Sequence, residues 1–271
     1  MKIYYVDSFT KEPFKGNPAA VVIVDNHISN SVMQSIAREI GFSETAFLQI
    51  NDNRKYSLRW FTPTTEVSLC GHATLATAKI FFTYLHPEES SVEFITKYGT
   101  ITCSQNDEYI KMDMQCDKLK EVNIYEKVRH LFAFPLNKSI FFSEFNHYLM
   151  LIVDDEVDLK QLTIKPAEIM ELDSLIPEIR GLILSNQAAG IVKMRFFDPW
   201  EGIDEDPVTG SAALVVAEYW LKHFNKDNIE IDQLSQRGGK MFVKKSKTGL
   251  TIMGTATVIL EGVLMVGDYG K

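Results

Sequence analysis

The feature that most constrains this chain is an internal repeat. Residues 17–25 (NPAAVVIVD) align without gaps with residues 146–154 (NHYLMLIVD). Residues 59–63 (RWFTP) align with residues 195–199 (RFFDP), again about half a chain away. Short apolar strings match easily by chance, but two motifs in the same order at similar separations favour a duplication. We therefore expect two similar lobes.

Each half contains a segment that predicts a buried helix. Residues 71–80 (GHATLATAKI) and 210–219 (GSAALVVAEY) are small and apolar without a wide polar face, as in helices that are covered on all sides. The segments around them alternate between polar and apolar residues or run apolar between turn residues, which is typical of strands. We predict an α+β fold of two pseudo-symmetric lobes, each a strongly curved, mostly antiparallel sheet wrapped round a central helix. The strand segments are residues 91–105, 108–115, 239–247 and 251–266.

A charged segment at residues 117–138 interrupts the pattern and is the candidate crossover between the halves. We place the N-terminal lobe at residues 1–120, completed by the last C-terminal strand, and the C-terminal lobe at residues 121–271. A more ordinary amphipathic helix is expected once per half. The clearer one begins near Ser29 and carries apolar residues at helical spacing.

Composition narrows the classes of partner. The net charge is −8 and the sequence has no dense cluster of Lys and Arg, so we expect neither nucleic acid nor a membrane as partner and favour a small molecule. The N-terminus lacks the apolar run of a signal peptide, which predicts a cytoplasmic protein. Three cysteines without metal-like spacing predict reduced thiols, with no disulfide and no zinc site. The sequence has no nucleotide or flavin motif either, so we expect no cofactor and no metal.

Glu44 is the first candidate for chemistry. If residues 42–48 form a strand, side chains alternate between its faces, and Glu44 shares the apolar face with Phe42, Ala46 and Leu48. A carboxylate on a core-facing row loses its hydration and must be hydrogen-bonded, paired or protonated. Glu44 is therefore either a titrating group or a structural partner of a buried amide or of an arginine such as Arg59.

The starts of the two predicted central helices are candidate anion sites. The first turn of a helix exposes unpaired N–H groups and the positive end of the helix dipole. Gly71 and Gly210 allow close approach of a ligand to the backbone, and Thr209 is a plausible N-cap. We expect a substrate carboxylate to be held between the two helix starts, with Ser211 among its ligands.

Polar side chains gather at the same two places. His72 enters the first helix and Asp206 lies just before the second, so both would flank the cleft toward which Glu44 points. Three titratable groups around one anion suit a reaction in which a base removes a C–H proton and returns it elsewhere. Taken singly, His72 could be a capping or core histidine, and Asp206 before Pro207 could initiate a turn.

Cys70 leaves two interpretations open. A thiol at a helix N-terminus has a lowered pKa and can act as a base. Racemases that need no cofactor use two opposed thiols, and the matching segment 206–211 has no cysteine. A paired-thiol mechanism is therefore excluded, and Cys70 is either a lone base or a small buried filler.

The chain resembles the phenazine-biosynthesis PhzF-like family over nearly its whole length. The resemblance implies a diaminopimelate-epimerase-like fold with the active site between two lobes, often as a homodimer. The motifs that carry it are residues 7–10 (DSFT), 16–21 (GNPAAV), 43–47 (SETAF), 59–63 (RWFTP), 69–74 (LCGHAT) and 205–212 (EDPVTGSA).

The resemblance also implies roles for single residues. Glu44 matches the acid/base glutamate of the family, and His72, Asp206 and Ser211 match residues that line its pocket. We add Asn17, from the second motif, to the predicted substrate-binding residues. In the phenazine enzyme the glutamate moves a proton within a dihydro-hydroxyanthranilate ring without any cofactor.

Two departures argue against transferring that substrate to this chain. Relatives often carry a histidine soon after the Gly-Ser-Ala of the second helix, where this sequence has Ala213 and Leu214. The family's Met-Asp-Phe-Pro strand ending is residues 112–115 (MDMQ) here. We therefore predict an isomerase that shifts a proton in a small carboxylate-bearing substrate. The alternatives are a one-base epimerase or racemase that uses Cys70, and a carboxylate-binding protein without turnover.

Overall fold

The computed structural model describes residues 1–24, 28–51, 55–132, 134–247 and 249–266. It divides into two compact units. Unit 1 contains Met1–Met114 and Met253–Lys271, and unit 2 contains Gln115–Ile252. The N-terminal and C-terminal segments of the chain thus belong to the same unit.

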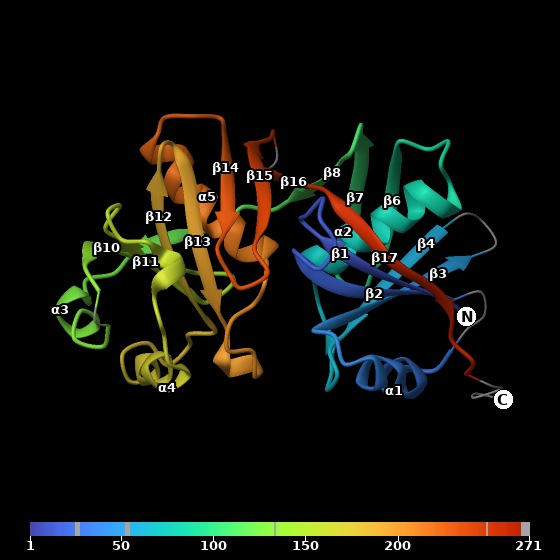
Figure 1. Ribbon diagram of the computed structural model, residues 1–271, viewed down its shortest axis with the longest axis horizontal. Helices are drawn as coiled ribbons and strands as arrows, with labels where there is room; N and C mark the ends of the chain where they lie inside the picture. The colour runs from blue at the N-terminus through green and yellow to red at the C-terminus, as the bar shows by residue number, and fades with distance from the viewer. Residues whose placement is uncertain (25–27, 52–54, 133, 248, 267–271) are drawn as a thin grey trace. The chain divides into compact units, whose positions relative to one another are not determined.

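Unit 1 is built from one sheet and two main helices (Figure 1). A short π-helical turn, Phe81–Leu85, continues the second helix. The helices are α1 (Asn30–Ile40) and α2 (Gly71–Ile80). The strands are β1 (Lys2–Ser8), β2 (Asn17–Val24), β3 (Glu44–Asn51), β4 (Lys55–Phe61), β5 (Glu66–Val67), β6 (Ser91–Thr96), β7 (Gly99–Asn106), β8 (Tyr109–Met114) and β17 (Ala256–Val263).

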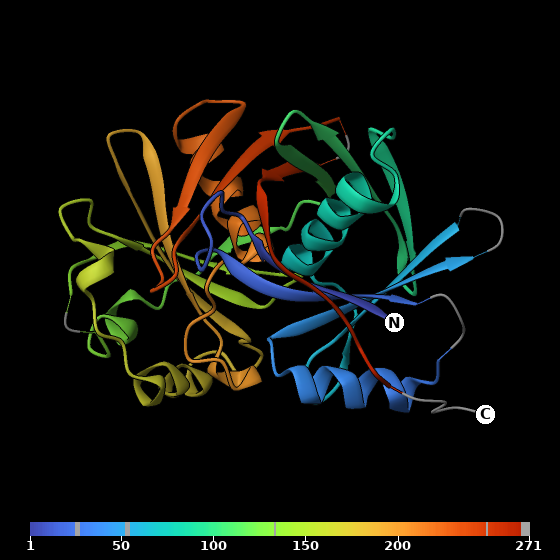
Figure 2. The same ribbon diagram turned by 45° about the vertical axis from the view of Figure 1, so that its right-hand side comes forward.

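The sheet of unit 1 wraps around α2. Its strands pair in the order β17, β1, β2, β3, β4, β6, β7, β8, and all these pairs are antiparallel except β2–β3 and β4–β6. The helix α2 contacts β1, β2 and β3 as well as β7, β8 and β17, which lie toward both ends of that order. Figure 2 shows α1 on the opposite side of the first strands from α2. The α2 helix is accordingly buried on nearly every side.

Unit 2 has more short helical turns. Its longest helix is α5 (Gly210–His223), and α3 (Tyr125–Val128) and α4 (Pro166–Met170) are short. Three 3-10 turns cover Leu159–Gln161, Glu171–Ser174 and Pro199–Glu201. The strands are β9 (Leu119–Glu121), β10 (Leu136–Ser143), β11 (Tyr148–Val153), β12 (Gly181–Ala188), β13 (Ile191–Phe197), β14 (Asn228–Gln233), β15 (Gly239–Lys245) and β16 (Leu250–Gly254), whose last residues pass into unit 1.

The strands of unit 2 repeat the pairing pattern of unit 1. Their order is β9, β10, β11, β12, β13, β14, β15, antiparallel except for β11–β12 and β13–β14. The central helix α5 contacts β9, β13, β14 and β15, so strands from both ends of the order again surround it. The segment 117–138, the predicted crossover, contains β9 and α3 and belongs to unit 2.

The hydrophobic cores confirm the repeat at the level of side chains. One cluster in unit 1 contains Ala20, Val22, Val24 and Phe61, packed with residues of α1. The corresponding cluster in unit 2 packs with residues of α4, and its aligned members are Leu149, Leu151, Val153 and Phe197. The alignment of residues 17–25 with 146–154 therefore pairs residues that perform the same packing role.

The α1 helix forms where the sequence predicts it. Ser29 is the N-cap and its side chain accepts a hydrogen bond from the Val32 N–H, which satisfies one donor of the first turn. The helix ends at Gly41, whose φ of 73° lies in the left-handed region that glycine adopts without strain. Met33, Ile36 and Ala37 form its buried face.

Two further findings concern segments that the sequence analysis singled out. Within the described residues, no helix has the length and apolar character needed to span a membrane. Cys70, Cys103 and Cys116 are all free thiols, as predicted.

Candidate active site

Each unit has the same ion pair, formed with a glutamate that lies five residues before the central helix. In unit 1, Arg59 Nε and Nη2 donate to the two carboxylate oxygens of Glu66, each at 2.8 Å. In unit 2, Arg195 Nε and Nη2 donate to Glu205 at 2.7 and 2.9 Å. Each guanidinium also lies over a phenylalanine two residues further along its strand, at 5.1 Å for Phe61 and 4.9 Å for Phe197. Arg59 thus serves Glu66 and is not the partner of Glu44.

The two helix starts have similar local geometry. Glu66 precedes Gly71, and Glu205 precedes Gly210, by the same number of residues. The N-cap positions are Cys70 for α2 and Thr209 for α5, and in the described part of the chain neither side chain caps its helix. The first N–H groups of both helices are therefore left to other partners, as an anion site requires.

Glu44 is the first residue of β3 and faces α2. Ala46 and Leu48 are buried, as the alternation predicts. The prediction is wrong for Phe42, which packs with the α1 cluster and against the ring of Tyr5. The reason is that the strand begins at Glu44, so the alternation does not extend back to residue 42.

The Glu44 carboxyl group lies beside His72 in unit 1. The distance from Glu44 Oε2 to His72 Nε2 is 3.3 Å, and the two side chains are 17 % and 8 % exposed. Oε2 is buried and, among the described residues, has no hydrogen-bond partner with good alignment. Burial raises the pKa of Glu44 above its ordinary value, and hydrogen bonds from Ser43 and Cys70 offset only part of that rise.

Asn17 and Ser43 complete the surroundings of the His72 ring. Asn17 Nδ2 lies 3.2 Å from His72 Nδ1, and Ser43 Oγ lies 3.5 Å from His72 Nε2. With the amide nitrogen of Asn17 donating to Nδ1, the proton of a neutral imidazole is on Nε2. That N–H is on the side of the ring where Glu44 lies.

Cys70 adds a thiol to this group. Its Sγ is 3.5 Å from His72 Nδ1, and the side chain is buried. The donor atoms of Glu44, Cys70 and His72 all lie within 4.8 Å of one another. One carboxylate, one thiolate and one imidazole are ligands that Zn²⁺ accepts, so these three side chains could hold a metal ion.

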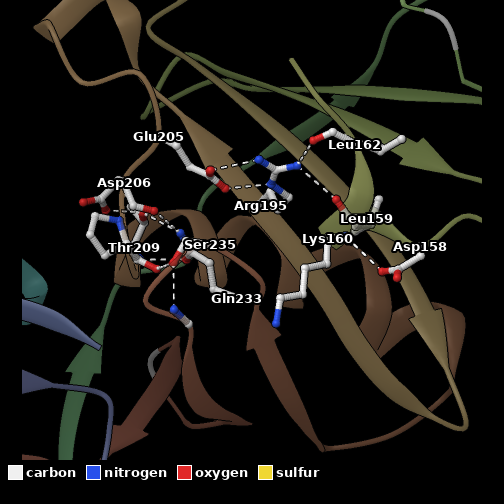
Figure 3. A network of polar contacts seen from close by, with 12 residues as sticks. Asp158, Leu159, Lys160, Leu162, Arg195, Glu205, Asp206, Thr209, Gln233 and Ser235 are labelled. Atoms are coloured by element: carbon white, nitrogen blue, oxygen red, sulfur yellow. Dashed lines mark hydrogen bonds and ion pairs between the residues drawn. The ribbon is translucent and has the colours of Figure 1, made fainter. Parts of the chain in front are cut away.

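In unit 2, Asp206 and Thr209 are held by a network of polar contacts (Figure 3). The Thr209 hydroxyl donates to the Asp206 carboxylate. The Gln233 side chain accepts from the Thr209 N–H at 2.8 Å and donates to the Asp206 carbonyl at 2.8 Å. Thr209 therefore occupies the predicted N-cap position, but its hydroxyl serves Asp206 instead of the helix.

Ser211 follows Gly210 in the first turn of α5 and corresponds to His72 in α2. Its Oγ lies 3.2 Å from the hydroxyl of Tyr148, which comes from the start of β11. The Tyr148 ring packs against Phe196 with their centroids 4.7 Å apart.

The predicted site residues thus form two groups, one in each unit. Glu44, His72, Asn17 and Gly71 lie together in unit 1, and Asp206, Thr209, Gly210 and Ser211 lie together in unit 2. That these groups share one cleft stays a prediction. Sequence analysis missed Ser43, Tyr148 and Gln233, although Gln233 ends a strand of alternating residues with its side chain on the buried side.

Comparison with known proteins agrees with the fold and the motifs. The family model described as "Phenazine biosynthesis-like protein" matches residues 6–262. An "uncharacterized isomerase" of Halalkalibacterium halodurans is 37% identical, and the alignment covers 97% of this chain and 98% of that protein. The crystal structure of a PhzF-family phenazine biosynthesis protein from Enterococcus faecalis superposes with a TM-score of 0.89 at 32% identity, covering 96% of this chain and 97% of that one.

A more distant likeness bears on the fold alone. A probable proline racemase from Agrobacterium radiobacter matches with a TM-score of 0.60 at 13% identity, over 99% of this chain and 94% of that one. This agrees with the predicted diaminopimelate-epimerase-like fold. The names of the relatives support an isomerase-type enzyme at the level of the family. The chain belongs to the phenazine biosynthesis-like PhzC-PhzF family.

Proposed function

We propose that this protein is an isomerase that moves a proton within a small carboxylate-bearing substrate without a cofactor, and that Glu44 carries the proton. The observation that carries the proposal is the buried Glu44 carboxyl group, which has a raised pKa and an Oε2 atom without a well-aligned partner among the described residues. A carboxylate whose pKa is raised is a stronger base than an ordinary glutamate, so it can accept a proton from the substrate and return it.

His72 is assigned the role of a neutral donor to Glu44. Asn17 holds the ring through Nδ1, and Nε2 lies 3.3 Å from Glu44 Oε2, close enough for its N–H to turn toward a carboxylate that forms there. When Glu44 has given its proton to the substrate, the Nε2–H stabilises the carboxylate. A donor to the ionised form lowers the pKa of the carboxyl group, so this contact opposes part of the rise that burial causes.

The substrate carboxylate is assigned to the helix starts. The first N–H groups of α2 and α5 follow N-cap residues whose side chains leave them uncapped within the described chain. Gly71 and Gly210 place no side chain over these donors, and Ser211 and Thr209 add hydroxyl groups beside α5.

The test is solvent-deuterium exchange. Small carboxylates with an acidic C–H bond are incubated with the protein in D₂O, and loss of C–H signals is followed by proton NMR. For a compound that wild type exchanges, we expect Glu44→Gln to lower the exchange rate by about 10²- to 10⁴-fold while the Kd changes less than about threefold. Glu39→Gln, at an exposed position of α1, is the matched control.

Three outcomes separate the alternatives. Exchange retained in Glu44→Gln would exclude Glu44 as the proton carrier. Calorimetric binding of a carboxylate by wild type without exchange of any hydrogen would identify a binding protein. Exchange that disappears after dialysis against EDTA and returns with Zn²⁺ would contradict the absence of a metal cofactor.

A one-base epimerase that uses Cys70 is the second candidate, because the thiol lies 3.5 Å from His72 Nδ1. Our proposal predicts that Cys70→Ala lowers the exchange rate far less than Glu44→Gln does, since the thiol only hydrogen-bonds the Glu44 carboxyl group. Loss of exchange in Cys70→Ala together with retention in Glu44→Gln would favour the epimerase.

A further inference from the structure

Tyr148 in unit 2 occupies a position that corresponds to the neighbourhood of Glu44 in unit 1. The parallel pair β2–β3 joins Ala19 to Glu44, and the parallel pair β11–β12 joins Tyr148 to Gly181. Because the strands of the two units pair in the same order, Gly181 corresponds to Glu44 and Tyr148 corresponds to Ala19. In unit 1 the larger residue of the pair is on the second strand, β3, whereas in unit 2 it is on the first strand, β11.

The space around Gly181 explains why only one of the two positions carries a large side chain. A Cβ atom at Gly181 would lie 2.6 Å from the Phe196 ring and 2.8 Å from the Tyr148 ring. The Tyr148 ring thus fills the volume that a side chain at residue 181 would need. Tyr148 reaches the start of α5 from β11, as Glu44 reaches the start of α2 from β3.

The two polar groups reach equivalent partners. Glu44 Oε2 contacts His72, the second residue of α2, and the Tyr148 hydroxyl contacts Ser211, the second residue of α5, at 3.2 Å. Unit 1 therefore has an acid beside an imidazole, whereas unit 2 has a phenol beside an alcohol.

We propose that Tyr148 is a positioning residue that donates its hydroxyl proton to Ser211 Oγ, so that the Ser211 hydroxyl in turn donates to the anionic group of the substrate. This inference rests on the proposed function, because it assigns the carboxylate of the substrate to the start of α5. It names a residue that sets the preference of the site for an anion over a neutral group.

The surroundings of Tyr148 keep it a donor. Burial raises its pKa by more than the hydrogen bond with Ser211 lowers it, and the charges of Asp198, Asp206 and Asp117 raise it further. The phenol therefore stays protonated throughout the physiological range. A hydroxyl that accepts one hydrogen bond donates a stronger one, and a donor chain that ends on a carboxylate is favoured over one that ends on a neutral amide.

The test compares a carboxylate with its neutral amide. Calorimetry is performed with a small carboxylate that wild type exchanges in D₂O and with the primary amide of the same compound, on wild type, Tyr148→Phe, Ser211→Ala and the double variant. Tyr148→Phe keeps the ring between Gly181 and Phe196. We expect it to weaken binding of the acid about tenfold, as for loss of one hydrogen bond in a charged network, and binding of the amide less than about twofold. Tyr219→Phe removes a phenol from α5 and serves as the control.

The double variant distinguishes positioning from packing. If Tyr148 acts through Ser211, the double variant binds the acid no more weakly than Ser211→Ala alone. Losses that multiply, or an equal loss for acid and amide in Tyr148→Phe, would overturn the inference while leaving the proposed function intact. Failure of wild type to prefer the acid to the amide would instead contradict the assignment of the carboxylate in the proposed function.

Discussion

The strand position that carries Glu44 in unit 1 carries Gly181 in unit 2, and the helix position that carries His72 carries Ser211. Around these positions the two units share their strand pairing and their matched cores. Each also has an arginine that donates two hydrogen bonds to a glutamate located before the central helix. The comparison teaches that the scaffold is repeated and the chemistry is not. The start of α2 has a carboxyl group beside an imidazole and a thiol, whereas the start of α5 has the Asp206 carboxyl group among hydroxyl groups and a buried amide.

The largest expected effect comes from removing the shared arginine in each unit. The Arg195 side chain is 10 % exposed and also donates to the carbonyl groups of Leu159 and Leu162, at 3.0 and 2.5 Å, whereas Arg59 is 28 % exposed. Arg195→Met leaves the half-buried Glu205 without its cation and the Leu159 and Leu162 carbonyl groups without their donor, and should cost about 3–5 kcal/mol of unfolding free energy. Arg59→Met should cost about 1 kcal/mol.

Urea unfolding followed by circular dichroism checks this contrast between the units. The double variants Arg195→Met/Glu205→Leu and Arg59→Met/Glu66→Leu serve as controls, because removing both charges avoids the unpaired carboxylate. If Arg195→Met and Arg59→Met lost equal unfolding free energy, the two ion pairs would be equally exposed in solution. That result would contradict the difference between the units.

The second largest effect concerns the space at Gly181, the residue of unit 2 that corresponds to Glu44. Gly181→Ala would place a methyl group 2.6 Å from the Phe196 ring, so we expect a loss of about 1–3 kcal/mol from overpacking. Gly262→Ala in β17 is the control, because its Cβ would make ordinary contacts at 3.4 Å or more. A neutral effect of Gly181→Ala in thermal unfolding would mean that Tyr148 does not fill this space.

The smallest expected effect is a pH-dependent gain in stability from Glu44→Gln. The pKa of Glu44 is raised above its ordinary value of 4.5, so the folded state binds this proton more tightly than the unfolded state does. Stability of the wild type therefore falls as the pH rises from 4.5 through the folded-state pKa. Glu44→Gln has no such titration.

Its stability advantage over wild type should grow across that interval and then stay constant at higher pH. Thermal unfolding of the two proteins from pH 4 to pH 8 measures it, with Glu39→Gln as the exposed control. If the stability advantage of Glu44→Gln shrank as the pH rose, the pKa of Glu44 would be lowered by folding and not raised.

Much of the scaffold could be predicted from local pattern. The absence of a polar face marked residues 71–80 as a buried helix, and α2 has those bounds. The second helix runs beyond the predicted residues 210–219 to His223, because Trp220 and Leu221 continue its buried face. Periodicity reports which residues are covered, so it located both central helices and the core-facing position of Glu44.

Partners of polar groups were harder to predict, because they depend on contacts between distant segments. Arg59 was a possible partner for Glu44, but the turn after β4 brings Glu66 back beside it. The contact between Tyr148 and Ser211 depends on how closely β11 approaches α5. The repeat aligns Tyr148 with Ala19. This replacement of a small apolar residue by a large polar one was the signal in the sequence that could have singled out Tyr148.

The central claim is that unit 1 contains a buried carboxyl group with a raised pKa, which unit 2 lacks at the equivalent position. The most direct measurement is a carbon-13 NMR titration of protein labelled at the glutamate Cδ, with the Glu44 signal assigned by its absence in Glu44→Gln. The account predicts a midpoint for Glu44 above 4.5. A midpoint for Glu44 at or below 4.5 would contradict the account.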